Sequence, residues 1–451
     1  MPLRLGSVKS NVGHLEAAAG IVGLVKLALS IRNGVLPPSL HYATPNPQIL
    51  FDEYGLTVQD RLTPWPRRSD ARRGGVSSFG FGGAICHVVA EELPRPEGSL
   101  VLLAEDSPQA LAERARALRD EHDLRAISGR PPGDGGFRLA AAARDMTELR
   151  AQLDAFADGT AAPGLSVGER GERGPRVAFL FSGNGSQWVG MGRQLLAGMP
   201  VFRRSMMRCD KRMRELLGFS LVDQLLAPDG RLDDMDVFQP LLFSMQVALV
   251  EAWRSLGVEP DVVVGQSVGE FAASHIAGAL DFEDASRLAA CHGRLLQQLA
   301  VGRGEGIVVT TGADAVRRYL TGQLTVSGHN GPNSTLVTGT PQEIDDLVQR
   351  LTEEGLTTHR VRMGHAPHSP LVNHVLAPLK AELAGLTPRT TRIPMISTVT
   401  GERVDGAELG PQYWADNLRR EIRVVDALTT LRDHDIDAVI ELSPQDRKSV
   451  V

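Results

Sequence analysis

A serine between two glycines is the strongest candidate for a reactive group in this sequence. The run Gly265-Gln266-Ser267-Val268-Gly269 directly follows the apolar residues 262–264 and precedes a helical pattern. A sharp strand-to-helix turn lifts a serine hydroxyl out of the sheet edge, and the helix N-terminus behind it supplies positive partial charge and free N–H groups. We therefore predict that Ser267 is a nucleophile and that the Val268 N–H is an oxyanion donor. A plain strand–turn–helix junction fits the same residues.

A serine hydroxyl needs a base before it attacks an acyl carbon. The chain has 12 histidines, and His365 and His368 stand out because they lie where a strand pattern ends in a turn held by Pro367 and Pro370. Loops of this kind commonly carry catalytic residues. The spacing alone favours a pair of solvated surface histidines.

Alternating apolar runs predict the elements that position these residues. Strand patterns at 177–181 and 261–264 alternate with helical patterns at 240–256 and 270–277, which predicts a parallel α/β sheet. Residues 307–362 read strand, helix, strand, strand, helix, strand, the order of a small ferredoxin-like subdomain.

Two segments of different composition precede this region. Residues 1–94 are rich in glycine and end in a strand-like apolar run at 88–90. Residues 95–176 hold helical patterns near 108–120 and 145–157, separated and followed by tracts rich in Gly and Pro. Such tracts are typical of linkers rather than of a core.

Composition excludes several classes of function. The chain has 451 residues and a net charge of −6 without a Lys/Arg cluster, which argues against nucleic-acid binding. No apolar run reaches the roughly 18 residues that span a bilayer, and no signal-peptide pattern begins the chain. Cys86, Cys209 and Cys291 lack paired spacing, which favours a reducing compartment and no metal site. We expect a cytoplasmic protein that does not bind membranes.

Five ordered blocks resemble the acyltransferase domain of modular (type I) polyketide synthases over about residues 177–446. They are Phe181-Ser182-Gly183-Asn184-Gly185-Ser186-Gln187-Trp188, Gln239-Pro240, Gly265-Gln266-Ser267-Val268-Gly269-Glu270, His365-Ala366-Pro367-His368-Ser369-Pro370 and Tyr413-Trp414-Ala415-Asp416-Asn417-Leu418-Arg419. The resemblance implies an α/β-hydrolase-like core with the ferredoxin-like subdomain at about 307–362. It also implies that residues 95–176 are the α/β linker domain that joins a ketosynthase to the acyltransferase.

The N-terminal segment resembles the end of a ketosynthase, a thiolase-type fold. Residues 6–14 are similar to its last catalytic block, which makes His14 and Lys9 remnants of a site, and residues 75–83 are similar to its C-terminal strand region. The block with the nucleophilic cysteine is not in the chain, and Cys86 does not lie in that setting. We expect no condensing activity from these residues alone.

The resemblance also implies roles in the acyltransferase site. Ser267 carries the acyl group as an ester, and His368 is its general base and then its acid. The backbone N–H groups of Val268 and Asn184 form the oxyanion hole, and the backbone carbonyl of Asn417 orients His368. The implied donor is an acyl-coenzyme A, and the acceptor is the phosphopantetheine thiol of an acyl carrier protein. No permanently bound cofactor or metal is implied.

The expected acyl pocket departs from the family pattern. Members that load malonyl or methylmalonyl groups carry an arginine 25 residues after the serine, where this chain has His292. That arginine grips the free carboxylate, and such a pair is worth roughly 1.5–3 kcal/mol, or about 10- to 150-fold. Arg294 is two residues further along the helix and is expected to point elsewhere.

Other pocket markers disagree with one another. His365 and Val268 resemble the malonyl type, whereas Pro367 replaces an aromatic residue, Gln266 replaces a histidine and Asn184 replaces a glutamine. We slightly favour a malonyl-type group. A non-carboxylated starter group, an acyl hydrolase and a non-catalytic scaffold of a megasynthase stay open. Residues 446–451 do not fit the family, and we expect them to be translated sequencing adapter.

Overall fold

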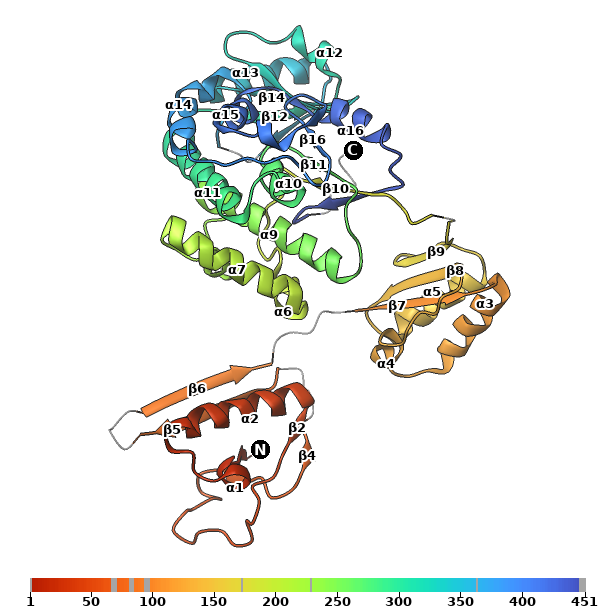
Figure 1. Cartoon of the computed structure of the whole chain (residues 1–451), viewed down its shortest axis with the longest axis vertical. Helices are drawn as coiled ribbons and strands as arrows, with labels where there is room; N and C mark the ends of the chain where they lie inside the picture. Colours follow the sequence, from red (N-terminus) through yellow and green to blue (C-terminus); the bar gives the residue numbers. More distant parts are fainter. Residues whose placement is uncertain are drawn as a thin grey trace. The chain divides into compact units, whose positions relative to one another are not determined.

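A computed structural model of the chain describes residues 2–65, 71–80, 85–92, 98–171, 173–227, 229–361 and 364–445. The chain divides after Arg95 into two units, which are described separately. The second unit contains Ser267 and His368 and, in its described residues, three sheets, one of which, the central sheet, carries the nucleophile (Figure 1).

The central sheet is mostly parallel and carries the nucleophile at the end of its middle strand. Its strand order is β17-β16-β11-β10-β19, and only the edge strand β17 runs antiparallel to its neighbour. This confirms the predicted parallel α/β architecture. The strands are β10 (Val177–Phe181), β11 (Val262–Gly265), β16 (Met395–Ser397), β17 (Arg403–Val404) and β19 (Ala438–Leu442).

Both faces of this sheet are buried, because side chains alternate along each strand. Phe179 and Val263 point into the larger core beneath the helices that follow β10 and β11. Val262 and Val264 point into a smaller core under α16 (Val424–Arg432). The larger core is covered by α7 (Pro200–Leu217), α9 (Met235–Ser255), α10 (Gly269–Ala277), α11 (Phe282–Leu299) and α14 (Asn373–Glu382).

Helix α9 begins five residues before its predicted start. The sequence pattern predicted a long helix from Pro240 to Leu256. In the structure α9 begins at Met235 and contains Pro240. The proline ring approaches Gly293 of α11, where an added Cβ would lie 3.3 Å from Pro240 Cδ. Close packing between the two helices compensates for the backbone hydrogen bond that proline cannot donate.

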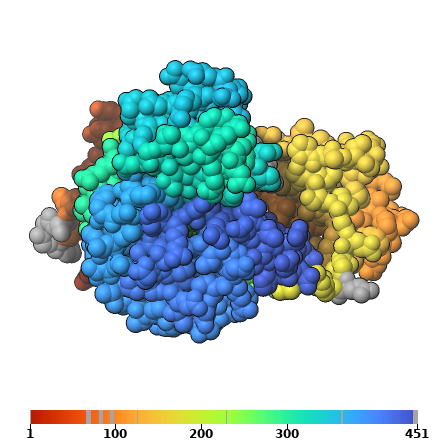
Figure 2. Space-filling view, turned by 90° about the horizontal axis from the view of Figure 1, so that it is seen from above, coloured from red at the N-terminus to blue at the C-terminus, as the bar shows by residue number. Residues whose placement is uncertain are grey.

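The ferredoxin-like subdomain has the predicted element order. Its antiparallel strands are ordered β15-β12-β14-β13, and β18 (Ile422–Arg423) adds to β13 in parallel. The C-terminal residues, blue in Figure 2, therefore lie against the subdomain. Its elements are β12 (Glu305–Val309), α12 (Ala313–Arg317), β13 (Thr325–Gly331), β14 (Ser334–Gly339), α13 (Pro341–Glu353) and β15 (Thr358–Val361).

The segment before the central sheet folds as an α/β domain, as predicted for the linker. Three antiparallel strands lie in the order β7-β8-β9. Helices pack on this sheet, and the domain has its own hydrophobic core. The elements are β7 (Ser99–Glu105), α3 (Pro108–Ala117), α4 (Leu124–Ser128), β8 (Phe137–Ala143), α5 (Met146–Ala157) and β9 (Leu165–Glu169). Shorter helices near the central sheet are α6 (Arg193–Gly198), α8 (Leu221–Leu226) and α15 (Pro411–Arg419).

The first unit contains one long helix, α2 (Ala19–Asn33), packed on the hairpin of β5 (Arg73–Phe79) and β6 (Ile85–Glu91). Part of the glycine-rich run predicted as ketosynthase-like, Phe81-Gly82-Gly83, lies outside the described residues, as do residues 446–451. The remaining elements are β1 (Leu3–Leu5), α1 (Lys9–Val12), β2 (Val35–Leu36), β3 (Leu56–Val58) and β4 (Thr63–Pro64).

Candidate active site

Ser267 and His368 form a buried hydrogen-bonded pair. Ser267 Oγ lies 2.9 Å from His368 Nε2, although the two residues are 101 positions apart in the sequence. Ser267 is 9% exposed and His368 is 3% exposed. The histidine is therefore not a solvated surface residue, and the serine has a base within proton-transfer distance.

The backbone at Ser267 is strained, as expected of a serine on a sharp turn. Its φ is +53°, in the left-handed region that favours glycine. The flanking glycines are needed for space rather than for their dihedral angles. A Cβ on Gly265 would lie 2.4 Å from Glu270 Cα, and one on Gly269 would lie 2.2 Å from the carbonyl oxygen of Phe181. The turn is thus pressed between its own helix and the neighbouring strand.

His368 has the tautomer of a general base. Its Nδ1 lies 2.8 Å from the carbonyl oxygen of Arg420, so Nδ1–H donates there and Nε2 accepts from Ser267. The predicted partner was the Asn417 carbonyl. The stronger contact comes from Arg420, because the carbonyls at the end of α15 lack partners within that helix. The Asn417 carbonyl adds a second interaction that favours the protonated form.

Burial keeps His368 neutral. Loss of solvent is the largest cause that lowers the pKa of His368 to about 4, and His365 lowers it further, while the Arg420 carbonyl opposes the change. The same turn is backed by the subdomain. Ser327 Oγ lies 3.3 Å from the His368 carbonyl oxygen, and Thr338 Oγ1 lies 3.4 Å from that of Pro367. His368 also has a left-handed φ, +59°.

The Val268 amide is suited to the predicted oxyanion role. Val268 immediately precedes α10, and its N–H makes no hydrogen bond within the described part of the chain. The loop after β10 passes directly beside it, since a Cβ on Gly183 would lie 2.8 Å from the carbonyl oxygen of Gln266. Asn184 follows in this loop. Its amide as the second donor stays a prediction.

His292 is buried and held in a neutral form. It is 2% exposed, its Nδ1 lies 2.7 Å from Gln239 Oε1, and its ring packs edge-on against Phe271 at 5.1 Å. Burial, with smaller contributions from His365 and His368, lowers the pKa of His292 to about 3. Because Nδ1–H donates to Gln239, Nε2 carries a lone pair. It has no hydrogen-bond partner among the described residues.

Arg294 does not replace the missing arginine. As expected, it points away from position 292 and pairs with Glu382, which also accepts from Cys291 Sγ. Of the other predicted pocket residues, Pro367 and His365 are buried beside His368. Gln266 instead turns toward the subdomain, where its Nε2 lies 3.4 Å from Asn330 Oδ1.

A buried acidic network behind Ser267 was not predicted. Glu270 is fully buried and accepts from Thr398 and Tyr413, and Asn417 donates to the Ser267 carbonyl. Loss of solvent raises the pKa of Glu270 to about 7, against these hydrogen bonds. A signal was present, because Glu270, Tyr413 and Asn417 all lie in the motif blocks. Their mutual contacts require the fold.

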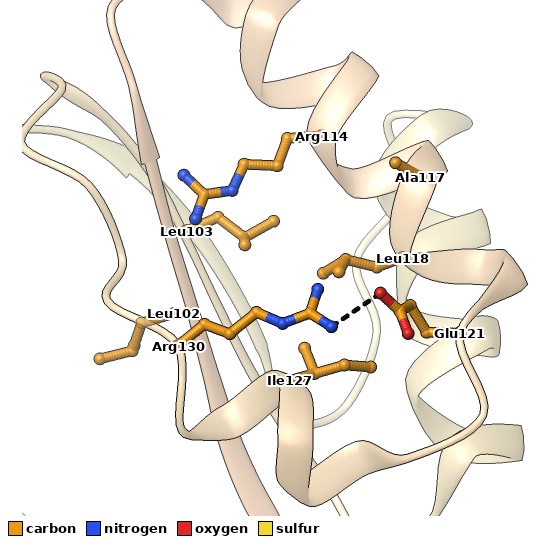
Figure 3. Close-up of a pocket in the computed structure, with 8 residues that line it drawn as sticks. All are labelled: Leu102, Leu103, Arg114, Ala117, Leu118, Glu121, Ile127 and Arg130. Atoms are coloured by element: carbon orange, nitrogen blue, oxygen red, sulfur yellow. Dashed lines mark hydrogen bonds and ion pairs between the residues drawn. The ribbon is translucent and has the colours of Figure 1, made fainter.

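Two of the predicted residues and the hollow of the linker domain do not belong to the site of Ser267 and His368. Lys9 and His14 are exposed in the first unit. The hollow in Figure 3 belongs to the linker domain, where the Arg130–Glu121 ion pair at 2.8 Å lies at its edge. None of the catalytic residues lines it. Within the described residues no helix is long and apolar enough to cross a membrane, and no group of three metal-binding side chains occurs.

A serine on a strained strand-to-helix turn, paired with a histidine held by a backbone carbonyl, is the arrangement of an enzyme that forms a covalent ester on serine. Comparison with protein families agrees. The acyl transferase domain family matches residues 178–446, and the chain belongs to this family. The beta-ketoacyl synthase C-terminal domain matches residues 1–43, and the ketoacyl-synthetase C-terminal extension matches residues 45–130. This combination is that of modular polyketide synthases.

Two polyketide synthases match this chain over almost its whole length. Erythronolide synthase EryA2 of Saccharopolyspora erythraea is 38% identical over 98% of this chain, which spans 13% of that protein's length. Polyketide synthase GfsA of Streptomyces halstedii is 36% identical over 98% of this chain, which spans 6% of that protein's length.

Solved structures of similar fold are acyltransferase domains. The domain from module 8 of the salinomycin polyketide synthase has a TM-score of 0.70 and 34% identity, covering 78% of this chain and 86% of that one. A loading acyltransferase from the avermectin modular polyketide synthase has a TM-score of 0.57 and 36% identity, covering 60% of this chain and 87% of that one.

Proposed function

We propose that this chain moves an acyl group from an acyl-coenzyme A to the phosphopantetheine thiol of an acyl carrier protein, within a polyketide synthase. One observation carries the proposal. Ser267 Oγ lies 2.9 Å from His368 Nε2, and the opposite nitrogen of His368 is held by a backbone carbonyl. The acyl transferase family match supports the reaction class.

In the first half-reaction Ser267 Oγ attacks the thioester carbonyl carbon as its proton passes to His368 Nε2. The negative charge on the carbonyl oxygen meets the Val268 N–H and the helix α10 N-terminus. The C–S bond then breaks, His368 returns the proton to the leaving thiolate, and an acyl ester remains on Ser267.

The second half-reaction reverses these steps. The carrier thiol gives its proton to His368, and its sulfur attacks the ester carbonyl. The C–O bond breaks and Ser267 recovers the proton. One thioester replaces another, so no oxidant, reductant or metal is required for the balance. A neutral His368 is needed at the start of both halves, and its lowered pKa supplies that form at neutral pH.

For the acyl group, the geometry at position 292 favours one without a free carboxylate, in contrast to our slight preference from sequence. His292 is neutral, its Nε2 offers a lone pair rather than a proton, and Arg294 is paired with Glu382. A buried carboxylate without a cation is strongly disfavoured. Among the solved structures of similar fold, one is described as a loading acyltransferase and another as a complex with a substituted malonyl group.

Intact-mass measurement of the purified protein after incubation with acetyl-, propionyl-, isobutyryl- and malonyl-coenzyme A tests this proposal, with Ser267→Ala as control. We expect a mass increase from the monoacyl donors that Ser267→Ala abolishes and that disappears when carrier protein is added. An adduct lost to water at the same rate without carrier would show a hydrolase. No adduct from any donor would indicate a non-catalytic scaffold.

A further inference from the structure

We infer that Glu270 is a positioning residue for Ser267, because its buried carboxyl holds the two side chains that grip the backbone of the nucleophile. The inference deepens the proposed function. It rests on that function for the acylation assay described below, whereas the fluorophosphonate assay does not depend on it. Within the described structure no hydrogen bond joins Glu270 to Ser267 Oγ or to the His368 ring. Its effect on the reaction would therefore pass through other residues.

The Glu270 carboxyl collects hydrogen bonds from two segments distant in sequence. Its Oε1 lies 2.8 Å from the Thr398 N and 2.7 Å from Thr398 Oγ1, after strand β16. Its Oε2 accepts from Tyr413 of α15, whose hydroxyl also lies 2.6 Å from Ser397 Oγ. The carboxyl is fully buried, so water cannot take over these contacts.

Both polar backbone groups of Ser267 are held by partners of this carboxyl. The Ser267 N–H points to Thr398 Oγ1 at 3.3 Å, and Asn417 Nδ2 donates to the Ser267 carbonyl at 3.3 Å. Asn417 also hydrogen-bonds to Glu270. Ser267 has a left-handed φ of +53°. A strained conformation persists only where its surroundings determine it. These contacts contribute to that, together with the Glu270 backbone N–H, which donates to the Ser267 carbonyl at 2.9 Å.

The same helix supports the base. Tyr413 and Asn417 lie one turn apart on α15, and Arg420, just past its end, supplies the carbonyl that orients His368. Glu270 thus ties the turn of the nucleophile to the helix that orients its base. A loss of this tie would change the distance between Ser267 Oγ and His368 Nε2. A displacement of about 1 Å at such a site costs roughly 100-fold in rate.

Two variants test the inference by different routes. Glu270→Ala removes the carboxyl, and Thr398→Val removes the hydroxyl with almost no change of shape. Each has a conservative partner, Glu270→Gln and Thr398→Ser. The Gln oxygen can accept both Thr398 hydrogen bonds, and its amide nitrogen can donate to the Tyr413 hydroxyl. Glu283→Ala is the matched control, because Glu283 also stands second in its helix but its side chain is 64% exposed.

Two assays are run on each variant. One measures kcat and KM for acylation of Ser267 by the best thioester. The other measures labelling of Ser267 by a fluorophosphonate, which needs no acyl specificity. We expect Glu270→Ala to lower both kcat and the labelling rate by about 100-fold, with KM unchanged. Thr398→Val should lower both by about 10-fold, again with KM unchanged. Glu270→Gln, Thr398→Ser and Glu283→Ala should stay within about threefold of the parent.

The inference is overturned if folded Glu270→Ala labels within twofold of the parent. It is also overturned if Glu270→Gln loses as much rate as Glu270→Ala, or if KM and thermal stability change while kcat does not. If Glu270→Ala does not fold, the Thr398 pair decides by the same criteria. If no thioester acylates the parent but labelling depends on Glu270, the proposed function fails while the positioning role stands.

Discussion

Substituting His292 by arginine should convert the acyl pocket into one that loads malonyl groups. The family resemblance predicts that His292 occupies the position of the arginine that grips the carboxylate in malonyl-type members, and the His292 side chain is only 2% exposed. The present histidine is neutral, since burial lowers its pKa to about 3. A guanidinium keeps its charge in such a place.

The size of the effect follows from the pair that would form. A hydrogen bond to a charged group contributes about 1.5–3 kcal/mol, which corresponds to roughly 10- to 150-fold in the ratio of malonyl to propionyl loading. Before substrate binds, the arginine would lack an anionic partner among the side chains that His292 contacts, because Gln239 and Phe271 are both neutral. The free variant should therefore melt at a lower temperature than the parent and recover stability when malonyl is loaded.

The assay is a competition. Equal concentrations of malonyl- and propionyl-coenzyme A are mixed with enzyme, the reaction is quenched, and the two Ser267 adducts are compared by intact mass. His292→Gln is the control, since it can keep a hydrogen bond to Gln239 without adding charge. A ratio unchanged within twofold in a folded His292→Arg variant would refute the assignment of position 292 to the acyl pocket.

Three further outcomes are expected. Acylation should keep its rate down to about pH 5 and fall with a midpoint near 4, because the buried His368 has a pKa of about 4; an inflection near 6.5 would contradict this. Glu270, whose pKa rises from 4.5 to about 7, keeps a proton that the unfolded chain has already released. Its contribution to folding stability is therefore full below pH 4.5 and is lost as pH rises through 7, so Glu270→Gln should flatten that part of the pH dependence in urea unfolding. Gly269→Ala, whose Cβ would lie 2.2 Å from the Phe181 carbonyl oxygen, should lower both the melting temperature and Ser267 labelling, whereas Gly168→Ala, with nothing within 4 Å, should change neither.

The sequence was sufficient for the architecture because apolar periodicity is local. The runs at 177–181 and 261–264 became β10 and β11, and the split βαβ order of 307–362 became the subdomain. Helix boundaries were less certain. The predicted helix began at Pro240, whereas α9 begins at Met235.

The candidate site was only partly predictable, because its contacts join distant segments. Ser267 and His368 carry motif signals, and the structure brings them together. No sequence motif indicates the role of the Arg420 carbonyl, because every residue type has a backbone carbonyl. The neutrality of His292 and the raised pKa of Glu270 both depend on burial, which no local pattern of residues reveals.

The turn of His368 is supported from two sides, by α15 of the larger core through the Arg420 and Leu418 carbonyls and by the subdomain. Ser267 ends a strand of the central sheet, whereas the subdomain side of the His368 turn is formed by Ser327 and Thr338. Reactivity at Ser267 therefore reports, in part, whether the subdomain is docked. A chimaera that exchanges the subdomain between relatives replaces one of the two supports of the base while leaving the nucleophile in place. Such exchanges should keep full reactivity only when the donor brings hydroxyl side chains at both positions.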